Sequence, residues 1–400
     1  MKVAIVGAGP AGLLASQALK SQGVDHFLLE AGAIHPRLDP IQGVGGAGLY
    51  SDGKFSFYPA GTKAWALEPR EMLAESYDFI STLLRDSGIS DPPIWSHSWK
   101  SSPLDSFEAD VQKTYPSFYL SLDERIVLIE KLARMAPIMT ASRLSSLRFR
   151  ANLIDLEYTV KDAPQSETVD GLVLATGRLW EANLHHDLPT TFNRLEAGVR
   201  VQQPSDIFAL KDTSAIDPKF IWRRQDPLRE YRTFCVCREG EIVHAETPVG
   251  TLCSGRKGET ATGKSNFGLM VRYLDQRTAP NLTLPLPFEI ALSQVRKDPT
   301  SLALLVGSPL SEHLLESASL LEDWIGLTLA EAVLAGPCLE GVGVYPTTYP
   351  KTLRAPIEAP VCIAGDAAGV FRGLVPALLS GHYAGTWLAH ELLTGRTPYE

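Results

Sequence analysis

The first thirty residues carry a hydrophobic pattern that predicts a strand, a helix and a second strand. Residues 2–6 (Lys-Val-Ala-Ile-Val) form a short apolar run, which favours a buried parallel strand. Over about 10–22 the apolar residues recur with the spacing of one helical face, and Gly23 follows as a helix-end signal. A second apolar run at 26–30 completes the strand–helix–strand unit.

The rest of the chain changes its periodicity twice. Helical and short apolar patterns alternate up to about residue 197, an alternating pattern typical of an antiparallel sheet runs from about 198 to 290, and helical patterns return afterwards. A glycine-rich stretch at 43–53 is expected to be irregular. The individual elements that we expect are helices near 69–86, 122–135, 311–334 and 373–393, and strands within 145–160, 171–176, 232–237, 267–273 and 361–364.

Composition narrows the classes of partner. The 400 residues carry a net charge of -9 and no basic run, which argues against nucleic acid and against an anionic membrane surface. The longest apolar runs fall far short of the ~20 residues of a membrane-spanning helix. Five scattered cysteines indicate a reducing, cytoplasmic location rather than a disulfide framework, and their spacing predicts no metal site.

A glycine motif lies between the first strand and the first helix. It reads Gly7-Ala-Gly9-Pro10-Ala11-Gly12, and each glycine has a physical role. Gly7 allows a tight turn, Gly9 lets the backbone approach a pyrophosphate, and Gly12 lets the helix pack closely on the strand. The helix N-terminus then offers free N–H groups to the phosphates. Glu30 ends the second strand, where a carboxylate accepts hydrogen bonds from a ribose hydroxyl.

Two further matches to nucleotide motifs lack the required context. Residues 43–48 repeat the GxGxxG letters, but no strand is expected before them and no helix after residue 49. Residues 258–265 (Gly-Glu-Thr-Ala-Thr-Gly-Lys-Ser) spell a Walker A pattern, yet a strand-like segment at 267–273 follows where a P-loop needs a helix. We therefore expect no triphosphate site there.

Two more strand ends complete a set that resembles the two-dinucleotide-binding-domain flavoproteins. One is Leu172-Val-Leu-Ala-Thr176-Gly177, and the other is Val361-Cys-Ile-Ala-Gly365-Asp366. The resemblance implies an FAD whose ribityl chain is bound by Asp366, whose pyrophosphate is lined by 367–369, and whose ring faces a helix beginning at Gly373, Leu374 and Val375. The alternative for Gly365-Asp366 is a capped helix start.

Four short segments are similar to those of a poorly characterised family of FAD-dependent dehydrogenases, distantly related to geranylgeranyl reductases. They are residues 45–54, 198–201, 234–237 and 365–373, and the similarity touches positions 3 to 385 in islands. One departure is that Arg-Glu-Gly follows the Phe-Cys-Val-Cys segment, where the family tends to show Pro-Gly-Gly. Further FAD contacts implied by the resemblance are Arg37, Gly45, Gly46, Ala47, Gly48, Ser51, Gly53 and Lys54.

The resemblance implies an α/β fold with an α+β second domain. A Rossmann-like FAD-binding domain is expected from 1–197 and 336–400, with an antiparallel-sheet substrate domain inserted at 198–335.

Candidate catalytic residues are Lys54, Cys235, Cys237 and Arg372. Lys54 would contact the flavin or the phosphates, unless it is a surface lysine at a turn. Cys235 and Cys237 alternate on one strand and so face one side, either as a thiol relay or as two small buried residues. Arg372 would bind an acidic substrate or a flavin oxygen. We expect His382 to be a packed core histidine.

The function expected from these features is an FAD-dependent dehydrogenase or reductase that transfers a hydride between flavin and a small organic substrate. Two alternatives remain open. One is a flavin-dependent monooxygenase or oxidase that uses O2, and the other is a flavin-bearing binding or RNA-modifying protein. NAD(P)H is a possible second substrate that would dock transiently, because the sequence holds no second credible dinucleotide fingerprint.

Overall fold

The computed structural model describes residues 1–34, 43–89, 91–99, 110–179, 188–224, 228–258 and 260–398. The chain divides into two compact units. The first comprises Met1–Ser102, Phe118–Thr191 and Tyr345–Glu400, and the second comprises Pro103–Ser117 and Phe192–Val344. The sequence places the corresponding boundaries after residues 197 and 335. Arg37 lies outside the described residues.

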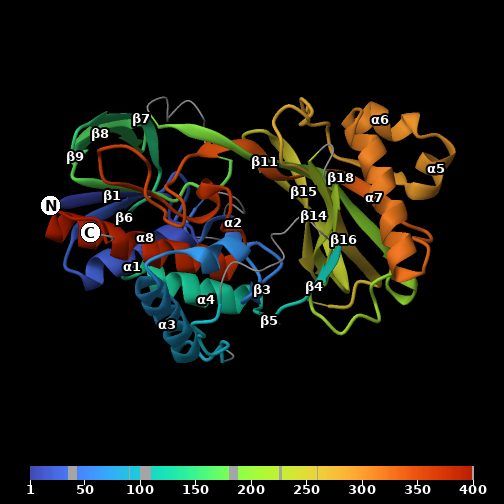
Figure 1. Ribbon diagram of the computed structural model, residues 1–400, viewed down its shortest axis with the longest axis horizontal. Coiled ribbons are helices and arrows are strands. Elements are labelled where there is room, and N and C mark those ends of the chain that lie inside the picture. The colour runs from blue at the N-terminus through green and yellow to red at the C-terminus, as the bar shows by residue number, and fades with distance from the viewer. Residues whose placement is uncertain are drawn as a thin grey trace. The chain divides into compact units, whose positions relative to one another are not determined.

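A five-stranded sheet forms the centre of the first unit, with strand order β19-β10-β1-β2-β6 (Figure 1). All its pairings are parallel. The central strands are buried on both faces, which explains why their sequences are continuous apolar runs rather than alternating ones. The strands are β1 (Lys2–Val6), β2 (Asp25–Leu29), β6 (Ile138–Met139), β10 (Gly171–Leu174) and β19 (Val361–Ile363).

Helices and smaller sheets complete the first unit. The helices α1 and α8 lie side by side (Figure 1). The helices are α1 (Pro10–Ser21), α2 (Gly46–Leu49), α3 (Arg70–Asp86), α4 (Leu122–Ala133) and α8 (Leu374–Thr394), with 3-10 turns η1 (Thr62–Ala66) and η5 (Gly365–Ala368). The smaller sheets are β7 (Ser142–Arg150) with β8 (Leu153–Val160) and β9 (Ala163–Val169), and β3 (Lys54–Ser56) with β5 (Ser117–Tyr119).

A seven-stranded sheet dominates the second unit, in the order β17-β18-β11-β16-β13-β12-β4. Helix α7 packs against β16 and β13 with its buried face, which includes Leu314 and Leu321. The elements are β4 (Val111–Lys113), β11 (Thr190–Pro204), η4 (Ser205–Ile207), β12 (Lys219–Arg224), β13 (Arg229–Cys237), β14 (Gly240–Thr247), β15 (Gly250–Lys257), β16 (Lys264–Tyr273), β17 (Phe288–Ala291), α5 (Leu292–Lys297), α6 (Thr300–Val306), α7 (Leu310–Ile325) and β18 (Val333–Pro346).

Three sequence-based expectations need correction. The glycine-rich stretch is not wholly irregular, because α2 forms one helical turn at Gly46–Leu49. The helical stretch expected to reach residue 334 ends at Ile325, since Gly326 adopts a left-handed conformation (φ 65°) and caps the helix. β18 then begins at Val333. The regular alternation expected at 232–237 is interrupted by a β-bulge between Phe234 and Cys237.

Parallel pairing brings the sequence motifs of the first unit to one edge of its sheet. Val6 is in register with Leu174 and with Leu29, and Leu174 is in register with Ile363. The loops that follow these four residues contain Gly7, Thr176, Glu30 and Gly365. Because ligands of open parallel sheets bind beyond the carboxyl ends of the strands, this edge is the place to look for a site.

Candidate functional site

The loop between β1 and α1 has the conformation that its glycines permit. Gly7 lies at φ 100°, and a Cβ atom there would come within 2.5 Å of the Ala175 carbonyl oxygen. At Gly12 a Cβ atom would come within 1.8 Å of the Gly7 carbonyl oxygen. Side chains at either position would force the loop away from β10 and α1.

The helix end in front of this loop is open. Gly9 is the N-cap of α1, with φ -71°, and no atom lies within 4 Å of where its Cβ would stand. Pro10 occupies the first helical position, where its missing N–H costs nothing, and no side chain caps the helix. The amides of Ala11 and Gly12 therefore face open space at the positive end of the helix dipole, as a pyrophosphate requires.

Glu30, at the end of β2, binds backbone amides. Its carboxylate accepts hydrogen bonds from the N–H groups of Ala8 (2.8 Å), Gly32 (2.9 Å) and Gly43 (3.0 Å). The side chain is 7% exposed. These bonds hold three turns around one acid, so Glu30 orders the loop at the sheet edge. Each carboxylate oxygen can accept more than one hydrogen bond, and the ribose contact therefore stays a prediction.

The glycine-rich segment that contains α2 packs on the same loop. The Gly45 N–H donates to the Ala8 carbonyl oxygen (2.9 Å). A Cβ atom at Gly48 would lie 2.8 Å from Pro10 Cγ and 3.0 Å from Leu374 Cδ2. The starts of α1 and α8 thus meet the segment 45–48, although these parts are far apart in the sequence. Gly46 lies at φ 51°, and Ala47 is exposed.

Lys54 is buried, not a surface lysine. Its side chain is 3% exposed, and Nζ lies 2.9 Å from the Asp52 carboxylate and 5.8 Å from the centre of the Tyr119 ring. Gly53 before it lies at φ 77°, where a Cβ atom would come within 2.4 Å of the Leu120 carbonyl oxygen. The Ser51 hydroxyl donates to the Gly48 carbonyl oxygen (2.8 Å). The turn is therefore rigidly built, and it fixes the ammonium group.

Asp366 follows β19 and provides a test of whether the site fits FAD. Its Oδ2 lies 3.5 Å from Arg178 Nη1, while Oδ1 is buried without a hydrogen-bond partner among the described residues. A buried acceptor without a donor is costly. A ribityl hydroxyl would supply that donor. Gly365 (φ 66°) anchors the turn, because its N–H donates to Ser380 Oγ of α8 (2.9 Å).

The other predicted contacts lie around the same edge. Thr176 and Gly177 follow β10 and are half-buried, with Gly177 at φ 73°. Gly373 (φ 101°) precedes α8, which begins at Leu374 as expected and continues through Val375. The bounds of α8 confirm the helix start that the sequence indicates. Arg372 is half-buried just before it.

The enclosed spaces in the first unit do not themselves outline a flavin. A cavity of about 10 Å³ is lined by Pro10, Gly48 and Leu374, among others, and holds at most one water. A larger cavity of about 440 Å³ is lined by residues that include Glu68, Lys351 and Arg354. None of its lining residues belongs to the predicted FAD contacts. The case for the cofactor therefore rests on the strand-end loops rather than on a pocket volume.

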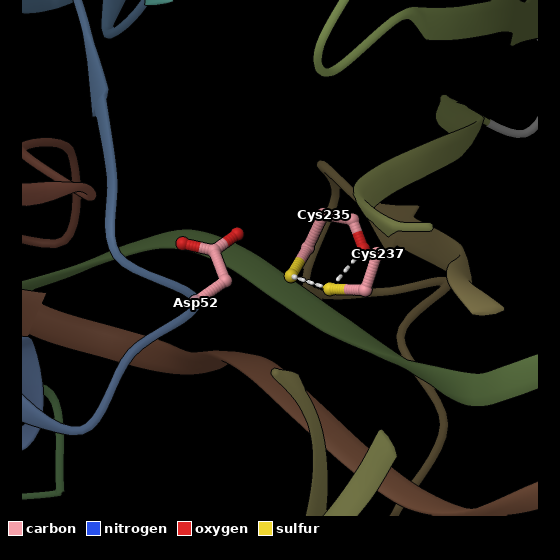
Figure 2. A group of neighbouring side chains, drawn as sticks. All are labelled: Asp52, Cys235 and Cys237. Atoms are coloured by element: carbon pink, nitrogen blue, oxygen red, sulfur yellow. Dashed lines mark hydrogen bonds between the residues drawn. The ribbon is translucent and has the colours of Figure 1, made fainter. Parts of the chain in front are cut away.

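The two cysteines of the Phe-Cys-Val-Cys segment lie in the second unit (Figure 2). Their Sγ atoms are 3.7 Å apart, which confirms that both face one side. Cys237 is fully buried and Cys235 is partly exposed. Asp52, also labelled in Figure 2, belongs to the first unit and has been described there with Lys54.

Sequence reasoning missed two arginines. Arg178 pairs with Asp366, and its position directly after Thr176-Gly177 was the available signal. Arg200 is wholly buried and donates to the Cys235 carbonyl oxygen (2.9 Å). It lies within the Gly198–Val201 segment that carried part of the family resemblance, so its signal was present but not interpreted.

Comparisons with known proteins agree with the site at the N-terminus. Residues 1–37 match the model of a family described as an FAD binding domain. The search of curated proteins found no match. Within the described residues, none of the helices combines the length and the hydropathy needed to cross a bilayer.

Solved structures with a similar fold include three whose titles name a function. They are CabE, an aromatic hydroxylase from angucycline biosynthesis (17% identical, TM-score 0.43, covering 99% of this chain and 63% of that one), the OxyS anhydrotetracycline hydroxylase from Streptomyces rimosus (13%, 0.41, 100% and 64%), and a flavoprotein/dehydrogenase from Cytophaga hutchinsonii (13%, 0.44, 99% and 79%). This chain spans less than two thirds of either hydroxylase. The TM-scores lie below 0.5, so we transfer no activity from these proteins.

The family match covers the glycine loop and the acidic end of β2, and the structure brings Asp366 and the start of α8 to the same sheet edge. This arrangement agrees with the resemblance that the sequence motifs carry. The chain is therefore a flavoprotein of the FAD-dependent oxidoreductase superfamily, and FAD is its cofactor.

Proposed function

We propose that this protein is an FAD-dependent dehydrogenase or reductase that transfers a hydride between its flavin and a small organic substrate. FAD, when bound, supplies the hydride and electron chemistry, and the chain supplies binding, orientation and electrostatics. The observation that carries the proposal is the convergence of Gly9, Asp366 and the start of α8 on one sheet edge, with an acceptor atom of Asp366 buried and unpaired.

The chain's own residues would divide this work. The amides of Ala11 and Gly12 would bind the pyrophosphate, and Asp366 would accept a hydrogen bond from the ribityl chain. The N-terminal amides of α8, at Leu374 and Val375, would stabilise negative charge on the ring, because a helix N-terminus carries a partial positive charge. Lys54, Arg372 and the cysteines remain candidates for contact with the ring or the substrate.

We also propose that the second unit is the substrate domain. Its large sheet carries a buried group of opposite charges, in which Arg272 lies 2.8 Å from Glu196 and 3.1 Å from Glu230. Burial raises the pKa of Glu230, but the neighbouring Arg272 and Arg232 lower it by more, so the net direction is downward. A rigid charged sheet of this kind suits recognition of a polar organic molecule.

Anaerobic titration of the FAD-loaded protein distinguishes a dehydrogenase from an oxygen-using enzyme. Flavin absorbance is followed while NADH, NADPH or candidate substrates are added, and either an artificial acceptor dye or air is then admitted. We expect turnover with the dye to exceed turnover with O2 by about tenfold or more. Oxygen consumption that depends on substrate and yields a hydroxylated product would contradict the proposal and establish a monooxygenase. Oxygen consumption that yields hydrogen peroxide would establish an oxidase.

A further inference from the structure

A strained turn brings two thiols together in the second unit. β13 contains one extra residue relative to β16 between Phe234 and Cys237, and within this bulge Cys235 adopts φ 51°. Such a left-handed conformation is unfavourable for a residue with a side chain, and strain of this kind gathers at functional positions. The result is that the Sγ atoms of Cys235 and Cys237 lie 3.7 Å apart (Figure 2). A disulfide needs about 2 Å between the sulfurs, a closure that side-chain rotation can supply.

A buried arginine lies against this pair. Arg200 is fully buried, and its Nη2 donates to the Cys235 carbonyl oxygen (2.9 Å). Its Nε donates to Asn266 Oδ1 (3.0 Å), and its guanidinium lies 5.7 Å from the centre of the Phe234 ring. Nη1 has no hydrogen-bond partner among the described residues. The chain makes room for the guanidinium with Gly255, where a Cβ atom would lie 2.1 Å from Nη2.

The charge of Arg200 has no carboxylate partner in the described part of the chain. Every other fully or nearly buried arginine of the sheet that we have described pairs with an acid, as Arg272 does with Glu196. Burial lowers the pKa of Arg200, whereas the thiols of Cys235, Cys237 and Cys338 raise it, and the net direction is upward. An unpaired buried cation is costly. A thiolate on the cysteine pair would be its counter-ion.

We propose that Cys235 and Cys237 form a thiol–disulfide redox site, with Arg200 as the counter-ion of its thiolate, that reacts with low-molecular-weight disulfides. This inference goes beyond the flavin chemistry and does not depend on it. The thiolate is the reactive form of cysteine, and cationic neighbours favour it. Cys235 is the partly exposed member and is the sulfur that a small disulfide reaches first.

The reaction balances as two exchange steps. The Cys235 thiolate attacks one sulfur of oxidised glutathione, forms a mixed disulfide and releases one glutathione thiolate. The Cys237 thiol loses its proton and attacks Cys235 Sγ, which forms the protein disulfide and releases the second glutathione thiolate. The two protein thiols lose two electrons and two protons overall, and oxidised glutathione is reduced to two molecules of glutathione.

The other cysteines of the chain provide internal controls. Burial, with a smaller effect of Glu289, raises the pKa of Cys253 to about 11. Burial also raises the pKa of Cys362 in the core of the first unit. Both thiols should therefore be slow to react.

Peptide mass spectrometry tests the proposal directly. Trypsin cleaves after Arg232 and Arg238, so the peptide 233–238 (Thr-Phe-Cys-Val-Cys-Arg) contains both thiols. The full-length protein is equilibrated with oxidised glutathione, alkylated with iodoacetamide and digested. We expect this peptide to take up no alkyl group and to be lighter by two hydrogen atoms than the reduced peptide. In Cys237→Ser, glutathione should remain attached to Cys235. Cys253→Ser is the matched control and should behave as the wild type.

The role of Arg200 has its own readout. In the reduced protein we expect iodoacetamide to alkylate Cys235 about tenfold faster than Cys253. Arg200→Gln should remove most of this advantage, and Arg200→Lys should restore it, which a merely structural role would not do. If Arg200→Gln does not fold, the comparison of Arg200→Lys and the wild type with the cysteine variants still decides. A peptide 233–238 that keeps two alkylatable thiols after oxidation, or equal rates at Cys235 and Cys253, would overturn the proposal.

Discussion

Asp366 is the residue on which the cofactor assignment can be tested with the least disturbance. Its Oδ1 is buried without a donor among the described residues, and its Oδ2 already faces Arg178. A hydrogen bond to a charged group contributes about 1.5–3 kcal/mol. We therefore expect Asp366→Ala to raise the dissociation constant for FAD by about tenfold or more, and Asp366→Asn, which keeps an acceptor, to raise it less.

The matched control for this change is Asp170→Ala. Asp170 precedes β10 at the opposite edge of the same sheet, where it accepts a hydrogen bond from the Lys2 N–H (2.6 Å). FAD affinity, measured by fluorescence quenching on titration of the apoprotein, should be unchanged in this variant. Equal affinities in Asp366→Ala and in the wild type would remove Asp366 from the cofactor site.

His382 gives the protein a pH dependence of known sign. The side chain is buried in α8, its Nδ1 lies 3.0 Å from Ser76 Oγ, and its ring centre lies 4.4 Å from that of Phe79. Burial lowers the pKa of His382 to about 4. The unfolded chain binds a proton near pH 6.5 and the folded chain does not, so this contribution to stability is present above pH 6.5 and is lost as the pH falls towards 4.

We expect this loss to amount to about 3 kcal/mol of unfolding free energy between pH 7 and pH 4. Urea unfolding at several pH values measures it. His382→Asn should be less stable at neutral pH but should show a shallower decline, whereas His390→Asn, at an exposed position of the same helix, should decline like the wild type. A parallel decline in His382→Asn and in the wild type would show that His382 does not control this titration.

At the scale of elements, the contact between α1 and α8 decides how closely the two ends of the chain approach. A Cβ atom at Gly381 would lie 2.0 Å from the Ala11 carbonyl oxygen, and one at Gly385 would lie 2.5 Å from the Ala15 carbonyl oxygen. These contacts involve backbone atoms, which cannot rotate away. The helices therefore touch through their backbones, and this holds Gly365 and Leu374 beside the start of α1.

We expect Gly381→Ala to destabilise the protein by about 3 kcal/mol, because overpacking outweighs the better helix propensity of alanine. Chemical unfolding provides the measurement, and FAD affinity should fall with it because the two halves of the site separate. His390→Ala, on the exposed face of α8, should leave both quantities unchanged. A fully stable Gly381→Ala variant would show that the helices are not in backbone contact.

Elements with a strong local pattern could be predicted from the sequence, and those fixed by tertiary contacts could not. The bounds of α1, β10 and α8 follow from apolar runs, Pro10 and the flanking glycines. The strand after the Walker-like letters was also predicted and is β16. β18 was missed, because its Gly and Pro residues hide a strand that pairs with β17. The bulge at Cys235 depends on the register with β16, which no local pattern encodes.

At the scale of the whole molecule, the predicted FAD contacts come from segments far apart in the sequence. Parallel register brings the ends of β1, β10 and β19 together, so the strand ends near Gly7, Thr176 and Gly365 meet at one edge. The sequence could indicate each segment but not the hydrogen bonds between them. The three amide bonds of Glu30 and the burial of Lys54 became visible only in the fold.

The flavin content of the purified chain tests the central claim most directly. The wild type, reconstituted with excess FAD and desalted, should retain close to one FAD per chain by absorbance. Gly9→Leu should fold, since its backbone suits any residue and no atom lies within 4 Å of its Cβ, yet the side chain would occupy the pyrophosphate position and the variant should be colourless. Failure of the wild type to retain any flavin, or full retention by a folded Gly9→Leu variant, would contradict the account.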